Sequence, residues 1–170
     1  GCLWGCEGVC GWVRARGLTG MARPCCPRCS RGRKSVQRGL TTEAGTAALD
    51  RLLATADVFV DNFRDVSLAK MGADPKVLRE KFPKLILASH KGFLEGPYQD
   101  RTALDEVVQM MTGLACMTGP PGRPLRFVPS AVDIFGGLFG AFSVMGAILE
   151  RRETNQGRDI RIGLFENGLL

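Results

Sequence analysis

The strongest constraint on the fold is an alternation, from Thr41 onward, between segments with helical periodicity and short apolar runs. The runs Asp57–Val60 and Leu85–Ala88 are short and apolar, which is typical of strands buried on both faces. Helix-start signals and apolar residues at helical spacing occupy the segments around them. We therefore expect strands at these two runs and at Asp159–Phe165, and helices from Thr41/Thr42, from Asp74 to Phe82, and over Ala103–Cys116 and Ala131–Arg152. Helices that alternate with buried strands predict an α/β fold with a mainly parallel sheet.

Length and charge narrow the class of protein. The 170 residues are about one domain's worth of chain. The net charge of +6 is unevenly distributed, because residues 1–41 carry eight Lys or Arg and one acid, whereas residues 42–170 carry 15 basic and 16 acidic residues. A nucleic-acid binder is not predicted, since such a protein needs its positive charge on a folded face or in a known module.

The cysteines are concentrated in the same N-terminal quarter. Six of the seven lie in the first 29 residues, and only Cys116 lies in the body. Cys26 and Cys29 have the spacing of a zinc or redox site, but no second pair follows, so no metal site is predicted. We expect residues 1–29 to be an atypical, poorly ordered segment rich in Cys, Arg and Gly. A body without a disulfide framework indicates an intracellular protein, cytoplasmic or mitochondrial.

One helix is apolar enough to suggest a membrane span. Ile134–Leu149 is 16 residues without a charge, and about 18–20 are needed to cross a bilayer. Charged residues follow directly at Glu150–Glu153, and Gly136, Gly137 and Gly140 would let other backbone approach closely. We therefore expect a buried core helix and no membrane partner.

Two residues stand out as candidates for chemistry. His90 is the single histidine and follows a strand, a position that favours a surface or packing role. Asp133 begins the apolar helix, where a carboxylate can simply cap the free N–H groups. It can equally be a carboxylate nucleophile that forms covalent acyl intermediates. The residue spacing leaves both interpretations of Asp133 open.

Many segments of the sequence resemble, in the same order along the chain, those of the class III (CaiB/BaiF) CoA-transferases. This family includes formyl-CoA:oxalate and carnitine CoA-transferases and α-methylacyl-CoA racemase. Thr55–Arg64 resembles the family's "ADV…ENFRPG" signature, and Ser30–Val36 resembles its "NRGKRSV" segment. The similarity continues through Lys70–Gly72, Pro83–Ser89, Lys91–Phe93, Gly96–Tyr98, Arg101–Gly113, Met117–Pro121, Asp133, Gly137, Glu150–Thr154 and the strand from Ile160. It covers residues 30–170, which the resemblance identifies as part of the family's large domain, an incomplete Rossmann-like parallel sheet with flanking helices.

The resemblance implies a reaction and residues that perform it. Asp133 falls at the family's catalytic aspartate, which attacks an acyl-CoA to form a mixed anhydride and then an enzyme–CoA thioester. An acceptor carboxylate reverses the exchange, without ATP, metal or a tightly bound cofactor. The positions that match the CoA site, or that would lie near the CoA phosphates, are Asn62, Phe63, Arg64, Lys70, Met71, Arg33 and Lys34.

The same resemblance bears on specificity and assembly. Leu104 stands where racemases of the family have a histidine base, so transferase activity is favoured over racemase activity. The sequence from Lys91 to Met111 is similar to the corresponding segment of members that use succinyl-CoA and dicarboxylates. The family forms an interlocked homodimer. An alternative is a catalytically inactive CoA-binding or scaffold fragment, because the family's second domain and glycine-rich lid are absent from the sequence.

Overall fold

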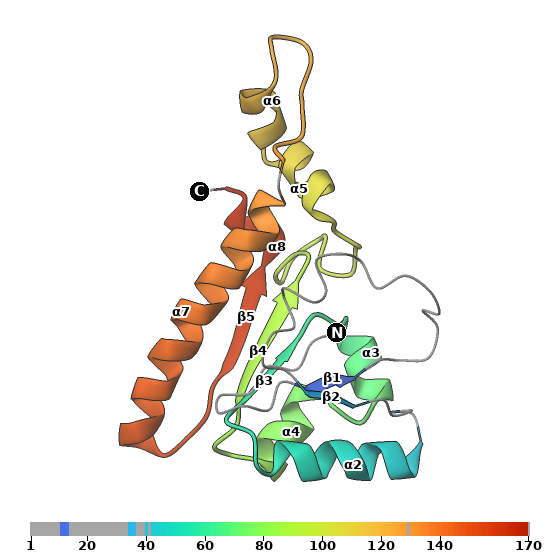
Figure 1. The fold of residues 1–170 in the computed structure, drawn as a ribbon, viewed down its shortest axis with the longest axis vertical. Helices are drawn as coiled ribbons and strands as arrows, with labels where there is room; N and C mark the ends of the chain where they lie inside the picture. The colour runs from blue at the N-terminus through green and yellow to red at the C-terminus, as the bar shows by residue number, and fades with distance from the viewer. Residues whose placement is uncertain (1–10, 14–33, 37–39, 41, 129, 170) are drawn as a thin grey trace.

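A three-stranded parallel sheet organises the part of the chain that the computed structural model describes, which is residues 11–13, 34–36, 40, 42–128 and 130–169. Its strands are β3 (Val58–Asp61), β4 (Ile86–Lys91) and β5 (Asp159–Gly163), in the order β3-β4-β5 (Figure 1). Val58 pairs with Ile86, and Leu87 pairs with Asp159. The expected α/β fold with a parallel sheet is confirmed.

Three helices cover one face of this sheet. They are α2 (Glu43–Leu53), α3 (Asp65–Lys70) and α4 (Pro75–Lys81). Sequence signals fix two of their starts: the Thr42 hydroxyl accepts from Gly45 N, and the Asp74 carboxylate accepts from Lys76 N with Pro75 in the first turn. Their apolar sides join alternate strand residues in one buried cluster of Leu49, Leu53, Phe59, Leu68, Ala73, Leu78, Leu85 and Leu87.

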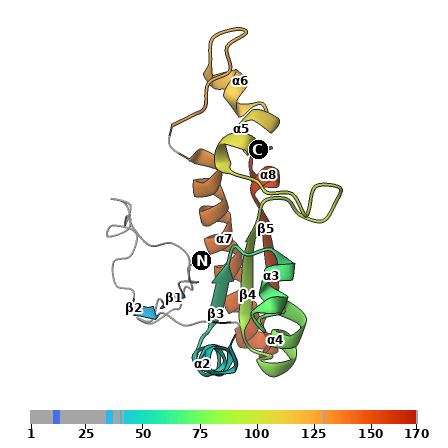
Figure 2. The same cartoon turned by 90° about the vertical axis from the view of Figure 1, so that its right-hand side faces the viewer.

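The long helix α7 (Ala131–Thr154) covers the opposite face, as Figure 2 shows. Here the other set of strand residues, Val58, Ile86, Ala88 and Ile162, packs with Ala147. Because successive side chains of a strand point to opposite faces, both sides of the sheet are buried, which explains the uninterrupted apolar runs in the sequence.

The chain between β4 and α7 extends beyond the carboxyl ends of the strands (Figure 1). The single helix expected over Ala103–Cys116 is wrong in detail. The structure has two short helices, α5 (Asp105–Met111) and α6 (Leu114–Thr118), separated at Gly113, whose φ of 85° is incompatible with a continuous right-handed helix. After β5, a short helix α8 (Leu164–Asn167) closes the described chain, where the sequence predicted strand through Phe165.

Within the first 40 residues, the structure describes two short parallel strands, β1 (Gly11–Val13) and β2 (Lys34–Val36). Lys34, a predicted CoA-site residue, is the first residue of β2. Arg33 and the cysteine pair Cys26/Cys29 lie outside the described residues.

Helix α7 is less buried than the sequence predicts. One side, with Gly136 and Gly140, packs on the sheet, whereas Ile134, Leu138, Phe142, Met145 and Leu149 are exposed in the described structure. The described chain offers this helix only one packing surface. By length and composition alone α7 could cross a membrane, and such a single helix is weak evidence for a span.

Gly157, which precedes β5, is required by close backbone packing. A Cβ at this position would overlap the Leu85 carbonyl oxygen, and Gly157 N donates to Pro83 O at 2.7 Å. We predict that Gly157→Ala lowers the free energy of unfolding by about 1–3 kcal/mol, because neither backbone segment can move without losing strand pairing. Urea denaturation followed by circular dichroism measures the effect.

Gly146→Ala in α7 is the matched control. A Cβ there meets nothing within 4 Å, so the same substitution is expected to stabilise the helix by roughly 0.5–1 kcal/mol. Equal stability of Gly157→Ala and the unsubstituted protein would contradict the packing argument.

Candidate functional site

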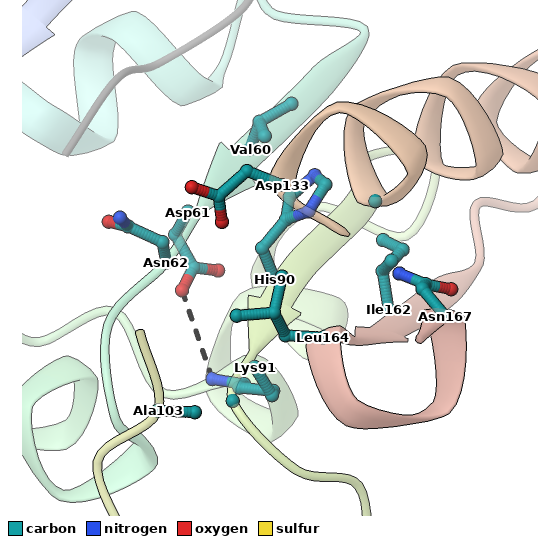
Figure 3. A pocket seen from close by; sticks show the side chains of 12 residues that line it. Val60, Asp61, Asn62, His90, Lys91, Ala103, Asp133, Ile162, Leu164 and Asn167 are labelled. Carbon is teal, nitrogen blue, oxygen red and sulfur yellow. Dashed lines mark ion pairs between the residues drawn. The ribbon is translucent and has the colours of Figure 1, made fainter. Parts of the chain in front are cut away.

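Asp133 lies in the first turn of α7, beside the carboxyl ends of β3 and β4. Its side chain borders a cavity of about 400 Å³ (Figure 3). The cavity is lined by Val60, Asp61, Asn62, His90, Lys91, Gly92, Ala103, Asp133, Gly136, Ile162, Leu164 and Asn167. Clefts outside the carboxyl ends of strands are where open parallel sheets bind ligands.

The Asp133 carboxylate has no hydrogen bond or ion pair with any described residue, and the structure excludes it as the helix cap. The N-cap of α7 is Ser130, and Asp133 is three residues further on. Partial loss of hydration raises the pKa of Asp133, and the neighbouring carboxylates of Asp105 and Glu106 raise it further, with Arg126 acting in the opposite direction. The result is an unpaired carboxylate that faces a cavity, as a nucleophile requires.

The start of α7 is instead capped by Asp105, for which the sequence predicted no such role. Asp105 Oδ1 accepts from the backbone N atoms of Val132 (2.9 Å) and Asp133 (3.1 Å). Its Oδ2 accepts from Gln109 Nε2 at 2.5 Å and lies 3.7 Å from Arg126 Nε. Asp105 is 4% exposed. Asp105, a buried carboxylate from another helix, therefore fixes the backbone of Asp133 and raises the pKa of the Asp133 side chain.

Gln109 completes this support. Its amide accepts from Phe127 N at 2.7 Å and donates to Phe127 O at 3.2 Å, so both ends of the side chain are held. Gln109 is fully buried. The only sequence signal for this network is the pair Asp105 and Gln109 at i and i+4 on one helix face.

His90 also lines the Asp133 cavity, and its ring packs against α7. A Cβ on Gly140 would lie 3.0 Å from His90 Cε1 and 3.1 Å from Nε2. Burial lowers the pKa of His90, and the charge of Asp61 opposes this. His90 thus packs against α7, as one of its two expected roles requires, and its position on the cavity wall was not foreseen. Leu104, where racemases have their histidine, is 55% exposed and has no titratable group.

The structure brings together most of the predicted CoA-site residues. Asn62, Phe63, Arg64 and Lys70 line a second cavity of about 480 Å³, which shares Asn62, His90, Lys91 and Gly92 with the first. Met71 does not line it but packs against the core cluster beneath α3. Among the described residues, no group of three or more His, Cys, Asp or Glu side chains could hold a metal ion.

Fold and site together define an α/β protein with an unpaired carboxylate at the carboxyl edge of a parallel sheet, next to a second, partly cationic cavity. The sequence profile described as CoA-transferase family III matches residues 14–170. The match begins 16 residues before Ser30, the first residue of the motifs that resemble the family. This chain belongs to CoA-transferase family III.

Relatives and solved structures agree with that assignment. The chain is 37% identical over 139 residues to a succinate–glutarate CoA-transferase from Agrobacterium fabrum, which covers 81% of this chain and 35% of the relative. It is 32% identical to a succinyl-CoA–D-citramalate CoA-transferase from Chloroflexus aurantiacus, over 84% of this chain and 36% of the relative. A CaiB/BaiF family protein from Brucella suis superposes with a TM-score of 0.80 and 35% identity, over 83% of this chain and 38% of that one. The chain thus spans about a third of the length of the curated relatives it matches.

The raised pKa of Asp133 has a consequence for stability. Between the unfolded pKa of 3.8 and the higher folded pKa, the folded state binds more protons than the unfolded state, so stability falls as the pH rises through this window. We predict that Asp133→Asn stabilises the protein at pH 7 and that the gain shrinks as the pH approaches 4. Urea midpoints at pH 4 and pH 7 measure this, and a gain that is equal at both pH values would contradict it.

The Asp105 network predicts how the Asp133 pKa can be changed. Asp105→Asn removes a negative charge beside Asp133, so the pKa of Asp133 should fall toward 3.8. Carbon-13 NMR titration of the Asp133 carboxyl group measures the change. Glu106→Gln removes a charge without breaking any bond to α7 and should give a smaller fall in the same direction. An unchanged Asp133 pKa in Asp105→Asn would show that the two carboxylates are not coupled.

Proposed function

We propose that this chain carries the nucleophile and part of the CoA site of a CoA-transferase, which moves CoA from an acyl-CoA such as succinyl-CoA to a small dicarboxylic acid such as glutarate. One observation carries the proposal: the unpaired Asp133 carboxylate borders a cavity that shares part of its lining with a second cavity, which is also lined by Phe63, Arg64 and Lys70. A thioester bound along both cavities would meet the carboxylate with its acyl end.

The proposed reaction begins when an Asp133 oxygen attacks the thioester carbonyl of the acyl-CoA. The C–S bond breaks, CoA leaves as a thiolate, and a mixed anhydride between Asp133 and the acyl group forms. The thiolate then attacks the Asp133 side of the anhydride, which releases the first acid as a carboxylate and leaves CoA on Asp133 as a thioester. The acceptor carboxylate repeats both steps in reverse, so no proton is consumed over the cycle.

The polar surroundings of Asp133 support this role. A carboxylate with a raised pKa is less stabilised as an anion by its surroundings than one in water, which favours its conversion to a neutral acyl derivative. Asp105 holds the backbone of Asp133 through two hydrogen bonds, so the attacking group starts from a fixed helix turn. Because Asp133 supplies the covalent chemistry, the proposal requires no metal and no tightly bound cofactor.

The second cavity suits an anionic ligand of extended shape. Arg64 and Lys70 are exposed cations at its border, where phosphate groups are favoured. We assign Asn62, Phe63, Arg64 and Lys70 to CoA binding, with Met71 supporting α3 from below. We also propose that the whole protein forms the interlocked homodimer that the family resemblance implies.

The choice of substrates rests on the relatives. Succinate and glutarate are named in the A. fabrum relative, and succinyl-CoA in the C. aurantiacus relative. A dicarboxylate acceptor is therefore the first to test. The alternative, a chain that binds CoA without transferring it, predicts binding in the absence of any covalent intermediate.

Hydroxylamine trapping distinguishes these possibilities. Hydroxylamine attacks an anhydride or an enzyme thioester and gives a hydroxamate, so incubation of the protein with succinyl-CoA and hydroxylamine should place a hydroxamate on Asp133, detectable by peptide mass spectrometry. Asp133→Asn should reduce the labelling at least ~10³-fold, as loss of a nucleophile does in other enzymes.

Glu80→Gln, which removes an exposed carboxylate on α4, is the matched control and should label like the unsubstituted protein. Labelling that persists in Asp133→Asn would refute the assignment of the nucleophile. Binding of CoA without labelling would support the alternative, a CoA-binding chain without transferase activity.

A further inference from the structure

We propose that Lys91 and Asp61 are positioning residues, which hold the segment Asn62–Arg64 in the conformation that binds CoA. The inference rests on the proposed function, because it concerns the CoA site. Neither residue was assigned a role by its sequence. Figure 3 shows the two side chains meeting where the carboxyl ends of β3 and β4 lie side by side.

Phe63 is fixed through both polar groups of its backbone. Its N–H donates to Asp61 Oδ1 at 3.0 Å, and its carbonyl oxygen accepts from Lys91 Nζ at 2.6 Å. The two side chains that hold it form an ion pair, with Lys91 Nζ 3.8 Å from Asp61 Oδ1. Because Asp61 belongs to β3 and Lys91 to β4, the backbone at Phe63 is tied to two paired strands of the sheet.

The same lysine holds the residue on the far side of Arg64. Lys91 Nζ donates to Asp65 Oδ1 at 2.7 Å, and this bond lowers the pKa of Asp65. Lys91 therefore contacts both neighbours of Arg64 in the sequence. The segment that we assign to CoA binding is anchored at its start by Asp61 and at its end by Asp65.

Lys91 is not placed to bind a phosphate itself. An ammonium group has three N–H donors. Two of these donors reach Phe63 O and Asp65 Oδ1. The ammonium group also lies 3.8 Å from the Asp61 carboxylate, which pairs with its charge. The Lys91 side chain is only 12% exposed, and that of Asp61 only 2%. Burial raises the pKa of Asp61, whereas the hydrogen bond from Ser89 and the charge of Lys91 lower it.

The pleat of β4 explains why these contacts form on one side only. Side chains alternate along a strand, so Ser89 and Lys91 face one way and His90 faces the other. Ser89 Oγ donates to Asp61 Oδ2 at 2.5 Å, on the side of the Asn62–Arg64 segment. His90 packs against α7 on the side of Asp133. Loss of Lys91 should therefore disturb the CoA segment and leave the Asp133 helix in place.

Lys91→Met, which keeps most of the side-chain volume but removes the charge and donors, tests the inference. We expect the dissociation constant for CoA, measured by isothermal titration calorimetry, to rise about tenfold or more, as for loss of one hydrogen bond to a charged group. Lys91→Arg, which keeps the charge, should recover part of the affinity. Lys81→Met, which breaks the exposed 3.0 Å pair with Asp50 at the opposite end of the sheet, is the matched control and should bind like the unsubstituted protein.

Hydrogen exchange gives a readout that does not depend on CoA. In Lys91→Met without ligand, the Phe63 amide should exchange about tenfold faster, while the amides at the start of α7 exchange as before. Asp61→Ala, which removes the acceptor of the Phe63 amide, provides a second variant if Lys91→Met does not fold.

The outcomes separate this inference from the proposed function. Unchanged exchange at Phe63 in both variants would overturn the positioning role. Faster exchange with unchanged CoA affinity would restrict these residues to stability and also overturn it. If the unsubstituted protein does not bind CoA at all, the proposed function fails and the positioning role for CoA fails with it, whatever the exchange data show.

Discussion

The hydrogen bonds of β4 to strands on both sides are the interaction on which the rest of the structure depends. β4 pairs with β3 and β5 and contributes Leu87 to one core cluster and Ile86 and Ala88 to the other. Its last residues then leave the core and supply the side chains of the site. The strand that organises folding thus also sets the distance between the Asp133 cavity and the CoA segment. A shift of one residue in its register would exchange the two faces and bring His90 to the place of Lys91.

Two buried carboxylates, Asp105 and Asp61, hold the backbone of the site in place, whereas the exposed carboxylate of Asp133 has no partner among the described residues. Asp105 and Asp61 are each satisfied by several donors, which compensates for their removal from water. Asp133 has no such compensation. The protein therefore keeps its charged supporting groups fully bonded and leaves unbonded the one group that we assign to bond formation. Function and stability make opposite demands at Asp133, and the fold meets the demand of function.

The sequence predicted those parts of the fold that depend on local chemistry. Thr42 and Asp74 act as helix caps as expected, and the apolar runs at β3 and β4 are strands because burial on both faces removes alternation. The break at Gly113 was missed, because periodicity through Ala103–Cys116 is compatible with one helix and only the positive φ reveals two. α3 was missed as well, since six residues are too few to show a period.

The sequence could name candidate members of the site, whereas it did not indicate the residues that support them. Asp133 was singled out by its place at the start of an apolar helix, and family resemblance then proposed it as the nucleophile and proposed the segment Asn62–Arg64 as part of the CoA site. Asp105, Gln109 and Lys91 each make a supporting contact with a residue 18 to 28 positions away, and no local pattern encodes such contacts. Asp61 also bonds Phe63 only two positions away, but its pairing with Lys91 depends on the placement of two strands. A surface or packing role was expected for His90, but its neighbours on α7 could not be known before the helix was placed on the sheet.

The double anchoring of Phe63 also has an entropic consequence. Fixing the backbone of one residue costs about 1–2 kcal/mol of conformational entropy, and for this segment that cost belongs to folding. A ligand that binds across Asn62–Arg64 meets a surface that is already ordered, so little of its binding energy is spent on ordering the protein. Affinity at this edge of the sheet is thereby linked to the stability of the sheet itself, and a destabilised sheet would bind its ligand more weakly without the loss of a single contact to it.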